Sequence, residues 1–496
     1  MSEPLFSLIV PTLNRAYTLR YVLQTILSQG LTDYELIVSD NRSSDNTAEV
    51  VREVCGERAV YVKPDRRLSM SRHWEFAMAK ARGRYVAFIG DDDGVTRHGL
   101  QIAAKLLADY DYPEALCSLN VEYHWPDSPI AGHESTVMVP VESGVRHRAS
   151  AQMLGLIKRH TRYYFDLPMI YRGFVSRETL TGITQKCGGF FHSSIPDVYA
   201  AIAVAAATRS YVFTSIPLFI EGISGASNGA ATTHKGVEAD ESFLLEDSIP
   251  WHSELKFFST TMTMLMAESL LQARDVGLLG NDSLMSPRDI IAHGAQFCAA
   301  LVPYRYEQTW IAIEHQAQKY HLEEYTETIR QQWPNQPSPV PDFPFCSTAY
   351  LRIYEPAIRV KLPGNSCTTV FDCMNLADQF RNDAEPESGI VGKVLMELAS
   401  QKFTTETERA RLERLHQFQS PLQDQFAASQ AQALRAARRY ENKSAEFEQK
   451  KHDWAQRNIR LKSRVEDLES NPSFSSLMKK WLKSFRGSRS PDQQEK

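Results

Sequence analysis

Short apolar runs alternate with stretches of spaced apolar residues through residues 1–100. The runs at 6–12, 34–41, 59–64 and 84–90 predict buried strands. The stretches between them, 18–30, 43–56 and 70–83, repeat apolar residues every three or four positions and predict helices. Because strands and helices alternate, we expect an α/β fold with a doubly wound, mostly parallel sheet and helices on both faces.

Beyond residue 100 the pattern becomes mixed and then helical. Residues 114–123 predict a strand, a helix is expected to begin near Pro196, and the Gly- and Ser-rich residues 222–236 predict a mobile loop. Residues 251–333 have helical spacing, and prolines cluster at 333–345 as in a stiff linker.

These patterns predict an α/β domain over 1–240, a mainly helical domain over 241–400 and a long helix over 401–471. The long helix carries apolar residues at steps of seven, which form one seam of a coiled coil. They are Phe426, Ala433, Tyr440, Phe447, Trp454, Leu461 and Leu468. Because the second seam is polar, two alternatives remain: a coiled coil that makes a homo-oligomer, and a helix packed on the body of the protein.

The C-terminal residues 472–496 have an amphipathic pattern with basic residues. The apolar face consists of Phe474, Leu477, Met478, Trp481, Leu482 and Phe485. Lysines and one arginine lie towards the other face. This arrangement predicts a helix in the plane of an anionic membrane surface. The alternative is a helix that docks on the protein itself or on a partner.

Composition narrows the class of protein. The formal charge of −5 argues against a general nucleic-acid binder, and a hydrophobic content of 43% is ordinary for a soluble globular protein. The seven cysteines are scattered and lack CxxC spacing, which favours a reducing compartment over disulfides or a zinc site. With no signal-peptide pattern and no long apolar run, we expect a cytoplasmic protein.

Polar residues follow three of the predicted strands. They are Pro11, Thr12, Asn14 and Arg15 after the first strand, Asp40 and Asn41 after the second, and Asp91, Asp92 and Asp93 after the fourth. The carboxyl ends of parallel strands share one edge of a sheet, where ligands bind. Three adjacent carboxylates repel one another, so either they form a solvated turn or they bind Mg²⁺ or Mn²⁺, which can bridge a diphosphate. Arg66, Arg67 and Arg72 are further candidate cations.

The segments SLIVPTLNRAYTLRYVLQTILSQ, YELIVSDNRSSDNT and ARGRYVAFIGDDD together resemble the nucleotide-sugar-binding half of the family 2 glycosyltransferases, which have the GT-A fold. The resemblance covers residues 1–100 and implies an acceptor-binding half over 100–240. It implies that Pro11, Thr12, Asn14 and Arg15 line the nucleotide-sugar site and that Asp40 contacts the base, most often uracil. From their own chemistry we also expect Asn41 to bind the nucleotide sugar through hydrogen bonds and Arg72 to bind it as a cation.

The aspartate triplet takes the place of the DxD motif of this family. Gly90 stands where the first aspartate of the family often stands, which is a departure from the pattern. The resemblance therefore implies that Asp91 contacts the nucleotide sugar, and that Asp92 and Asp93 bind the metal.

The same resemblance implies a catalytic base at the start of a helix in FHSSIPDVYAAI, where Asp197 is the only acid. Such a carboxylate must reach the acceptor hydroxyl to remove its proton. The alternative is that Asp197 caps the helix and favours its dipole. His192 and His234 are weaker candidates for contact with the metal or the diphosphate.

We therefore expect a metal-dependent inverting glycosyltransferase that moves a sugar from a nucleoside-diphosphate sugar, with a UDP-sugar as the favoured donor, to a glycan or lipid-linked acceptor. The implied pathway is surface polysaccharide assembly, such as O-antigen or capsule, on the inner face of the plasma membrane. One alternative is a degenerate sugar-nucleotide-binding scaffold. A nucleotidyltransferase is disfavoured, because PTLNRAYT lacks the glycine and lysine of its phosphate loop.

Overall fold

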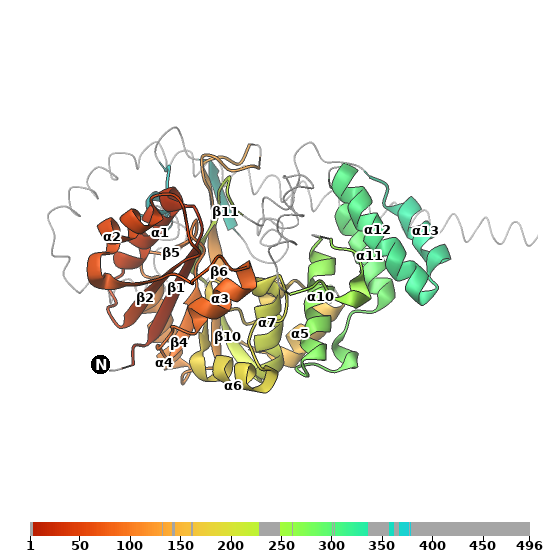
Figure 1. Cartoon of the computed structure of the whole chain (residues 1–496), viewed down its shortest axis with the longest axis horizontal. Coiled ribbons are helices and arrows are strands. Elements are labelled where there is room, and N and C mark those ends of the chain that lie inside the picture. Colours follow the sequence, from red (N-terminus) through yellow and green to blue (C-terminus); the bar gives the residue numbers. More distant parts are fainter. Residues whose placement is uncertain are drawn as a thin grey trace, which may run out of the picture. The chain divides into compact units, whose positions relative to one another are not determined.

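Four parallel strands form the first part of the sheet in the computed structural model of the chain (Figure 1). They are β1 (Phe6–Thr12), β2 (Tyr34–Asp40), β3 (Ala59–Val62) and β4 (Tyr85–Phe88), in the order β3-β2-β1-β4. The helices between them are α1 (Ala16–Leu27), α2 (Thr47–Cys55) and α3 (Met70–Met78). The predicted strand and helix alternation of this region is confirmed.

The strand order reverses between β1 and β4, so this is the topological switch point of the sheet. Two strands follow β1 on one side, and the crossover that contains α3 brings β4 to the other side. Accordingly α1 packs with α2, whereas α3 packs with α7 (Pro196–Ala207). The loops after β1, β2 and β4 therefore come together at one edge of the sheet.

The remaining strands make the sheet mixed rather than mostly parallel. These strands are β5 (Gly94–Val95), β6 (Ala115–His124), β7 (Thr136–Pro140), β8 (Val145–Ala149), β9 (Gly173–Ser176), β10 (Ser210–Ile223) and β11 (Ala357–Lys361). β9 is antiparallel to both β4 and β6, and β10 is parallel to β6 but antiparallel to β5 and β8. The expectation of a mostly parallel sheet thus holds for the first four strands, whereas β6 with β10 is the one parallel pair among the remaining described strands.

Helices make up most of what remains of the fold. They are α4 (Gly99–Asp109), α5 (Ser150–Lys158), α6 (Arg177–Cys187), α10 (Met262–Asp275), α11 (Pro287–Cys298), α12 (Pro303–Tyr320) and α13 (Glu323–Gln332). The helical prediction for 251–333 is confirmed. Both α7 and α10 are buried on nearly all sides and pack against each other (Figure 1), so one apolar core runs from the sheet into the helical region.

The structure describes residues 3–335, without 131, 141–143, 160–161, 228–248, 260, 300 and 302, together with 357–361 and 367–377 without 376. All of them belong to one compact unit, residues 1–404. Most of the predicted linker, the long helix at 401–471 and the basic tail at 472–496 lie outside the described residues. Within the described ranges, no helix is both long and apolar enough to cross a membrane.

Two local expectations differ from the structure. Gly222 and Ile223, expected in a mobile loop, are the last residues of β10, because they pair with Tyr123 and His124 of β6. β11 lies in a region expected to be helical, yet its backbone pairs antiparallel with β7. Alternating apolar residues in β11 fit a strand, and pairing with a distant strand is not visible in a local pattern.

Candidate functional site

The loops after β1 and β2 are joined by hydrogen bonds at the carboxyl edge of the sheet. Asn14 has a left-handed backbone (φ 55°), and its side-chain oxygen accepts from the Ser44 amide at 2.7 Å. Asp45 in turn accepts from the Ala16 amide at 3.0 Å, at the start of α1. Asn14 therefore fixes the shape of this edge, which is a structural role in addition to the predicted nucleotide contact.

Asp40 ends β2 and is almost completely buried. Its carboxylate accepts from the Ser43 amide at 2.7 Å, from the Tyr61 hydroxyl and from Lys63 Nζ at 2.8 Å. Burial alone would raise the pKa of Asp40, but the hydrogen bonds from Lys63, Tyr61 and Ser43 outweigh it and lower that pKa. Asp40 is thus a charged, rigidly held acceptor at the predicted base site.

Two other predicted nucleotide contacts lie nearby, the buried Asn41 and the exposed Arg72. The Asn41 side chain donates to the Leu68 carbonyl at 2.7 Å and accepts from the Leu68 amide at 2.9 Å. It therefore holds the loop before α3 against the end of β2. Arg72 lies in the first turn of α3 with an exposed side chain.

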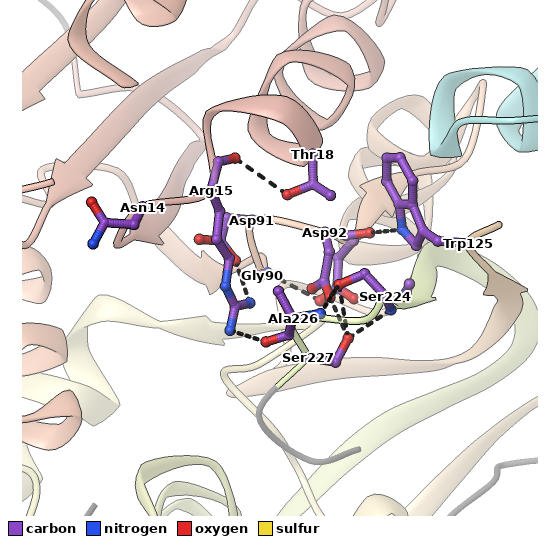
Figure 2. A network of polar contacts seen from close by, with 12 residues as sticks. Asn14, Arg15, Thr18, Gly90, Asp91, Asp92, Trp125, Ser224, Ala226 and Ser227 are labelled. Atoms are coloured by element: carbon purple, nitrogen blue, oxygen red, sulfur yellow. Dashed lines mark hydrogen bonds and ion pairs between the residues drawn. The ribbon is translucent and has the colours of Figure 1, made fainter. Parts of the chain in front are cut away.

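Arg15 lies between the first loop and the aspartate triplet. Its guanidinium donates to Asp91 Oδ1 at 2.8 Å and to the carbonyl of Ala226 (Figure 2). Burial alone would lower the pKa of Arg15, but Asp91 and Asp92 outweigh it, so that pKa is raised. Burial also raises the pKa of Asp91, and the adjacent guanidinium opposes this rise. The structure therefore brings Arg15 and Asp91 together, as predicted residues of one site.

Asp92 is held by residues that follow β10. Its Oδ2 accepts from the Ser224 hydroxyl at 2.6 Å and from the Ser227 hydroxyl, and its backbone carbonyl accepts from Trp125 Nε1 at 2.9 Å (Figure 2). Asp92 Oδ1 accepts no hydrogen bond from any described residue. One oxygen of this carboxylate is therefore left for a ligand.

Asp93 is fully buried, and both of its carboxylate oxygens have partners within the protein. The Arg172 guanidinium lies 3.3 Å from both of its oxygens, and the backbone amides of Gly90 and Gly222 donate to it at 3.0 and 2.9 Å. Arg172 also donates to Glu221 Oε1 at 3.0 Å. Both Asp93 oxygens thus take part in an internal ion pair, which is a structural role beside the predicted contact with the metal.

The residues present fit a divalent cation at Asp92. Among the described residues, Arg15 pairs with Asp91 and Arg172 pairs with Asp93 and Glu221, whereas no ion pair involves Asp92. No group of three His, Cys, Asp or Glu side chains converges in the described ranges. A cation here would therefore take one or two carboxylates from the protein and complete its shell with phosphate oxygens and water, as Mg²⁺ commonly does.

Asp197 lies in the first turn of α7, directly after Pro196 at the first helical position. Its Oδ2 accepts from the Tyr164 hydroxyl at 2.8 Å, and its side chain is half-buried. Burial raises the pKa of Tyr164 well above its usual value, and Asp197 adds to that rise. Tyr164 therefore stays a neutral donor that orients this carboxylate and leaves Oδ1 available.

The loop that leads to Asp197 is fixed from two sides. The Phe190 and Phe191 amides donate to Glu75 of α3, at 3.0 and 2.9 Å. The Ser193 hydroxyl donates to Glu268 of α10 at 2.5 Å, and Glu268 is fully buried. The helical region thus takes part in placing Asp197.

The two histidines singled out in the sequence have different outcomes. His192 Nε2 lies 3.1 Å from the Gly189 carbonyl, which fits a structural role within the loop before α7. His234 lies outside the described residues.

Several residues of this site carry no signal in the sequence. Arg172, Glu221 and Trp125 belong to no motif, and they reach the aspartates only through the sheet pairing of β6, β9 and β10. Ser224 and Ser227 lie in the Gly- and Ser-rich segment 222–236, and such a composition fits a ligand-binding turn as well as the mobile loop that it predicts.

Comparison with known proteins places the chain in context. Residues 7–124 match the family described as Glycosyl transferase family 2. A Campylobacter jejuni GalNAc(5)-diNAcBac-PP-undecaprenol beta-1,3-glucosyltransferase is 34% identical over 93 residues, which cover 18% of this chain and 30% of that protein. The Escherichia coli glucosyltransferase WfgD, which acts on alpha-D-GlcNAc-diphosphoundecaprenol with UDP-Glc, is 31% identical over 93 residues, covering 19% and 37%. The matched segments thus span about a third of these relatives.

Solved structures give a weaker likeness. Staphylococcus aureus TarS matches with a TM-score of 0.37 and 14% identity over 66% of this chain and 55% of TarS. A Pyrobaculum calidifontis mannosyltransferase in complex with GDP-Man and Mn²⁺ has a TM-score of 0.33 and 17% identity, over 68% and 89%. At these TM-scores neither structure supports a functional argument. The sequence match, together with the strand-end carboxylates, identifies residues 7–124 as a domain of glycosyl transferase family 2.

Proposed function

We propose that this protein is a metal-dependent, inverting glycosyltransferase of the GT-A fold that uses a nucleoside-diphosphate sugar. The observation that carries the proposal is the meeting of Asp40, Arg15, Asp91 and Asp92 at the topological switch point of the parallel strands. This is the place where doubly wound sheets bind nucleotides. The proposal is supported by the family match of the segment that contains all four residues.

Different residues are proposed to bind the base, the diphosphate and the divalent cation of the donor. Asp40 is charged and held by three donors, so it is suited to accept a hydrogen bond from a base N–H group. Arg15 holds the Asp91 carboxylate at 2.8 Å, and these two residues are the proposed contacts for the ribose and the diphosphate. When bound at Asp92, a divalent cation supplies positive charge that stabilises the departing diphosphate. A UDP-sugar is the donor that we propose.

Asp197 is the proposed base. Its Oδ1 accepts the proton of the acceptor hydroxyl while the hydroxyl oxygen bonds to the anomeric carbon of the sugar. The bond between that carbon and the diphosphate oxygen breaks at the same time, so the nucleoside diphosphate leaves and the configuration inverts. Tyr164 holds Oδ2 at 2.8 Å and keeps the carboxylate oriented for this transfer.

We further propose that the acceptor is a glycan or lipid-linked glycan of a surface polysaccharide. The polyprenyl-diphosphate acceptors in the names of two relatives support this class of acceptor. The basic amphipathic pattern of 472–496 supports peripheral attachment to the inner face of the plasma membrane, where such an acceptor is held. Self-association through 401–471 belongs to the same proposal.

The test is release of nucleoside diphosphate from a panel of nucleotide sugars with Mn²⁺, comparing the native protein with Asp92→Ala and Asp197→Ala. We expect both variants to lose turnover, while Asp197→Ala still binds UDP in calorimetry, because Asp197 does not belong to the nucleotide loops. Equal turnover in all three proteins would refute the site. UDP binding without any turnover in the native protein would instead favour a sugar-nucleotide-binding scaffold.

A further inference from the structure

A short turn directly after β10 closes over Asp92. Ser224, which is fully buried, donates its hydroxyl to Asp92 Oδ2 at 2.6 Å, and Ser227 donates to the same oxygen (Figure 2). One carboxylate oxygen thus receives two hydroxyl donors from residues that lie three positions apart.

Hydrogen bonds within the turn orient these hydroxyl groups. The Ser224 amide donates to Ser227 Oγ at 2.8 Å, and the Ser227 amide donates to the Ser224 carbonyl at 3.0 Å. Between them, the Ala226 carbonyl accepts from Arg15, the residue that pairs with Asp91. The turn is therefore tied both to itself and to the neighbouring carboxylate of the site.

The backbone of Asp92 is fixed as well as its side chain. Trp125 donates its indole N–H to the Asp92 carbonyl at 2.9 Å. Gly222 permits the close approach of β10, since a Cβ at this position would lie 1.8 Å from the Asp92 carbonyl oxygen. With its carbonyl and Oδ2 both held, the carboxylate has one orientation, in which Oδ1 is the free oxygen.

Groups that donate to a metal-binding carboxylate determine its orientation, and their loss commonly weakens metal binding by about 10- to 100-fold. We propose that Ser224 and Ser227 are positioning residues that present Asp92 Oδ1 to the divalent cation of the donor diphosphate. This inference rests on the proposed function, and it names two residues for that function outside the matched segment 7–124.

The experiment measures binding of Mn²⁺ in the presence of UDP by electron paramagnetic resonance, on the full chain. We expect Ser224→Ala/Ser227→Ala to bind Mn²⁺ about tenfold more weakly or worse. The variant should also need more Mn²⁺ for half-maximal turnover, while kcat at saturating Mn²⁺ stays close to that of the native protein. The single variant Ser227→Thr keeps a hydroxyl group at this position, so it should bind Mn²⁺ as the native protein does.

The matched control is Ser215→Ala, because Ser215 is a buried serine of β10 whose hydroxyl accepts from Arg146 instead of reaching the aspartates. It should bind Mn²⁺ as the native protein does. A folded double variant, with native circular dichroism, that binds Mn²⁺ as tightly as the native protein would overturn the inference and leave the proposed function standing. A native protein that binds no Mn²⁺ with UDP would overturn both.

Discussion

Glu221 makes the stability of the fold depend on pH in a way that one substitution should remove. It lies near the end of β10, where burial raises its pKa from 4.5 to about 7; Glu122 and Asp93 add to the rise, and Arg172 opposes it. In the unfolded chain the carboxyl recovers its ordinary pKa. Between the two values the folded state therefore binds more protons than the unfolded state does.

The sign and size of the effect follow from linkage. Where the folded state binds more protons, the free energy of unfolding falls as the pH rises, in this case through the window from 4.5 to about 7. At about 1.4 kcal/mol per pKa unit, the loss of stability over that window is roughly 3 kcal/mol. Glu221→Gln has no proton to lose and can still accept from Arg172, so it should lack this loss.

The assay is urea unfolding, followed by tryptophan fluorescence, at a series of pH values between about 5 and about 8. We expect the native protein to lose roughly 3 kcal/mol more than Glu221→Gln across that series. The matched control is Glu178→Gln, at an exposed position in the first turn of α6, which should follow the native profile. Parallel profiles for the native protein and Glu221→Gln would refute the reasoning.

Two further substitutions test the contacts that support the site. Arg172→Met should destabilise the fold by about 3–5 kcal/mol in urea unfolding, because it leaves Asp93 buried without its counter-ion. The control is Arg20→Met, which removes an exposed ion pair with Glu53 and should cost less than about 1 kcal/mol. A small effect of Arg172→Met would mean that Asp93 is neutral. Glu268→Ala should lower kcat while UDP binding is unchanged, because it frees the loop before the proposed base; unchanged kcat in a folded variant would contradict this.

The sequence was most informative where structure is local. The four strands and three helices of residues 1–100 follow from apolar spacing, and their order alone brings Arg15, Asp40 and Asp91 to one edge. That these residues lie at the same edge of the sheet could be predicted because parallel strands joined by helices have one favoured handedness.

The partners of the aspartates could not be predicted in this way. Arg172 and Ser224 lie 79 and 132 positions from the aspartates that they contact, and no periodic pattern links residues so far apart. For the same reason the sequence could not predict that the aspartates of the triplet have different partners. Asp92 and Asp93 have the same side chain and differ in their partners, which are the Ser224 hydroxyl for Asp92 and the buried Arg172 guanidinium for Asp93.

The pairing of β11 with β7 has a consequence for dividing the chain into fragments. β7 lies between β6 and β11, so a fragment that stops after α13 would leave β7 as an open edge with unsatisfied backbone groups. It would also remove the Cys367 carbonyl that accepts from the buried Tyr123 hydroxyl at 3.3 Å. The sheet of residues 6–223 and the described residues of 357–377 thus belong to one compact unit, and cutting the chain at the proline-rich segment would expose a strand prone to aggregation.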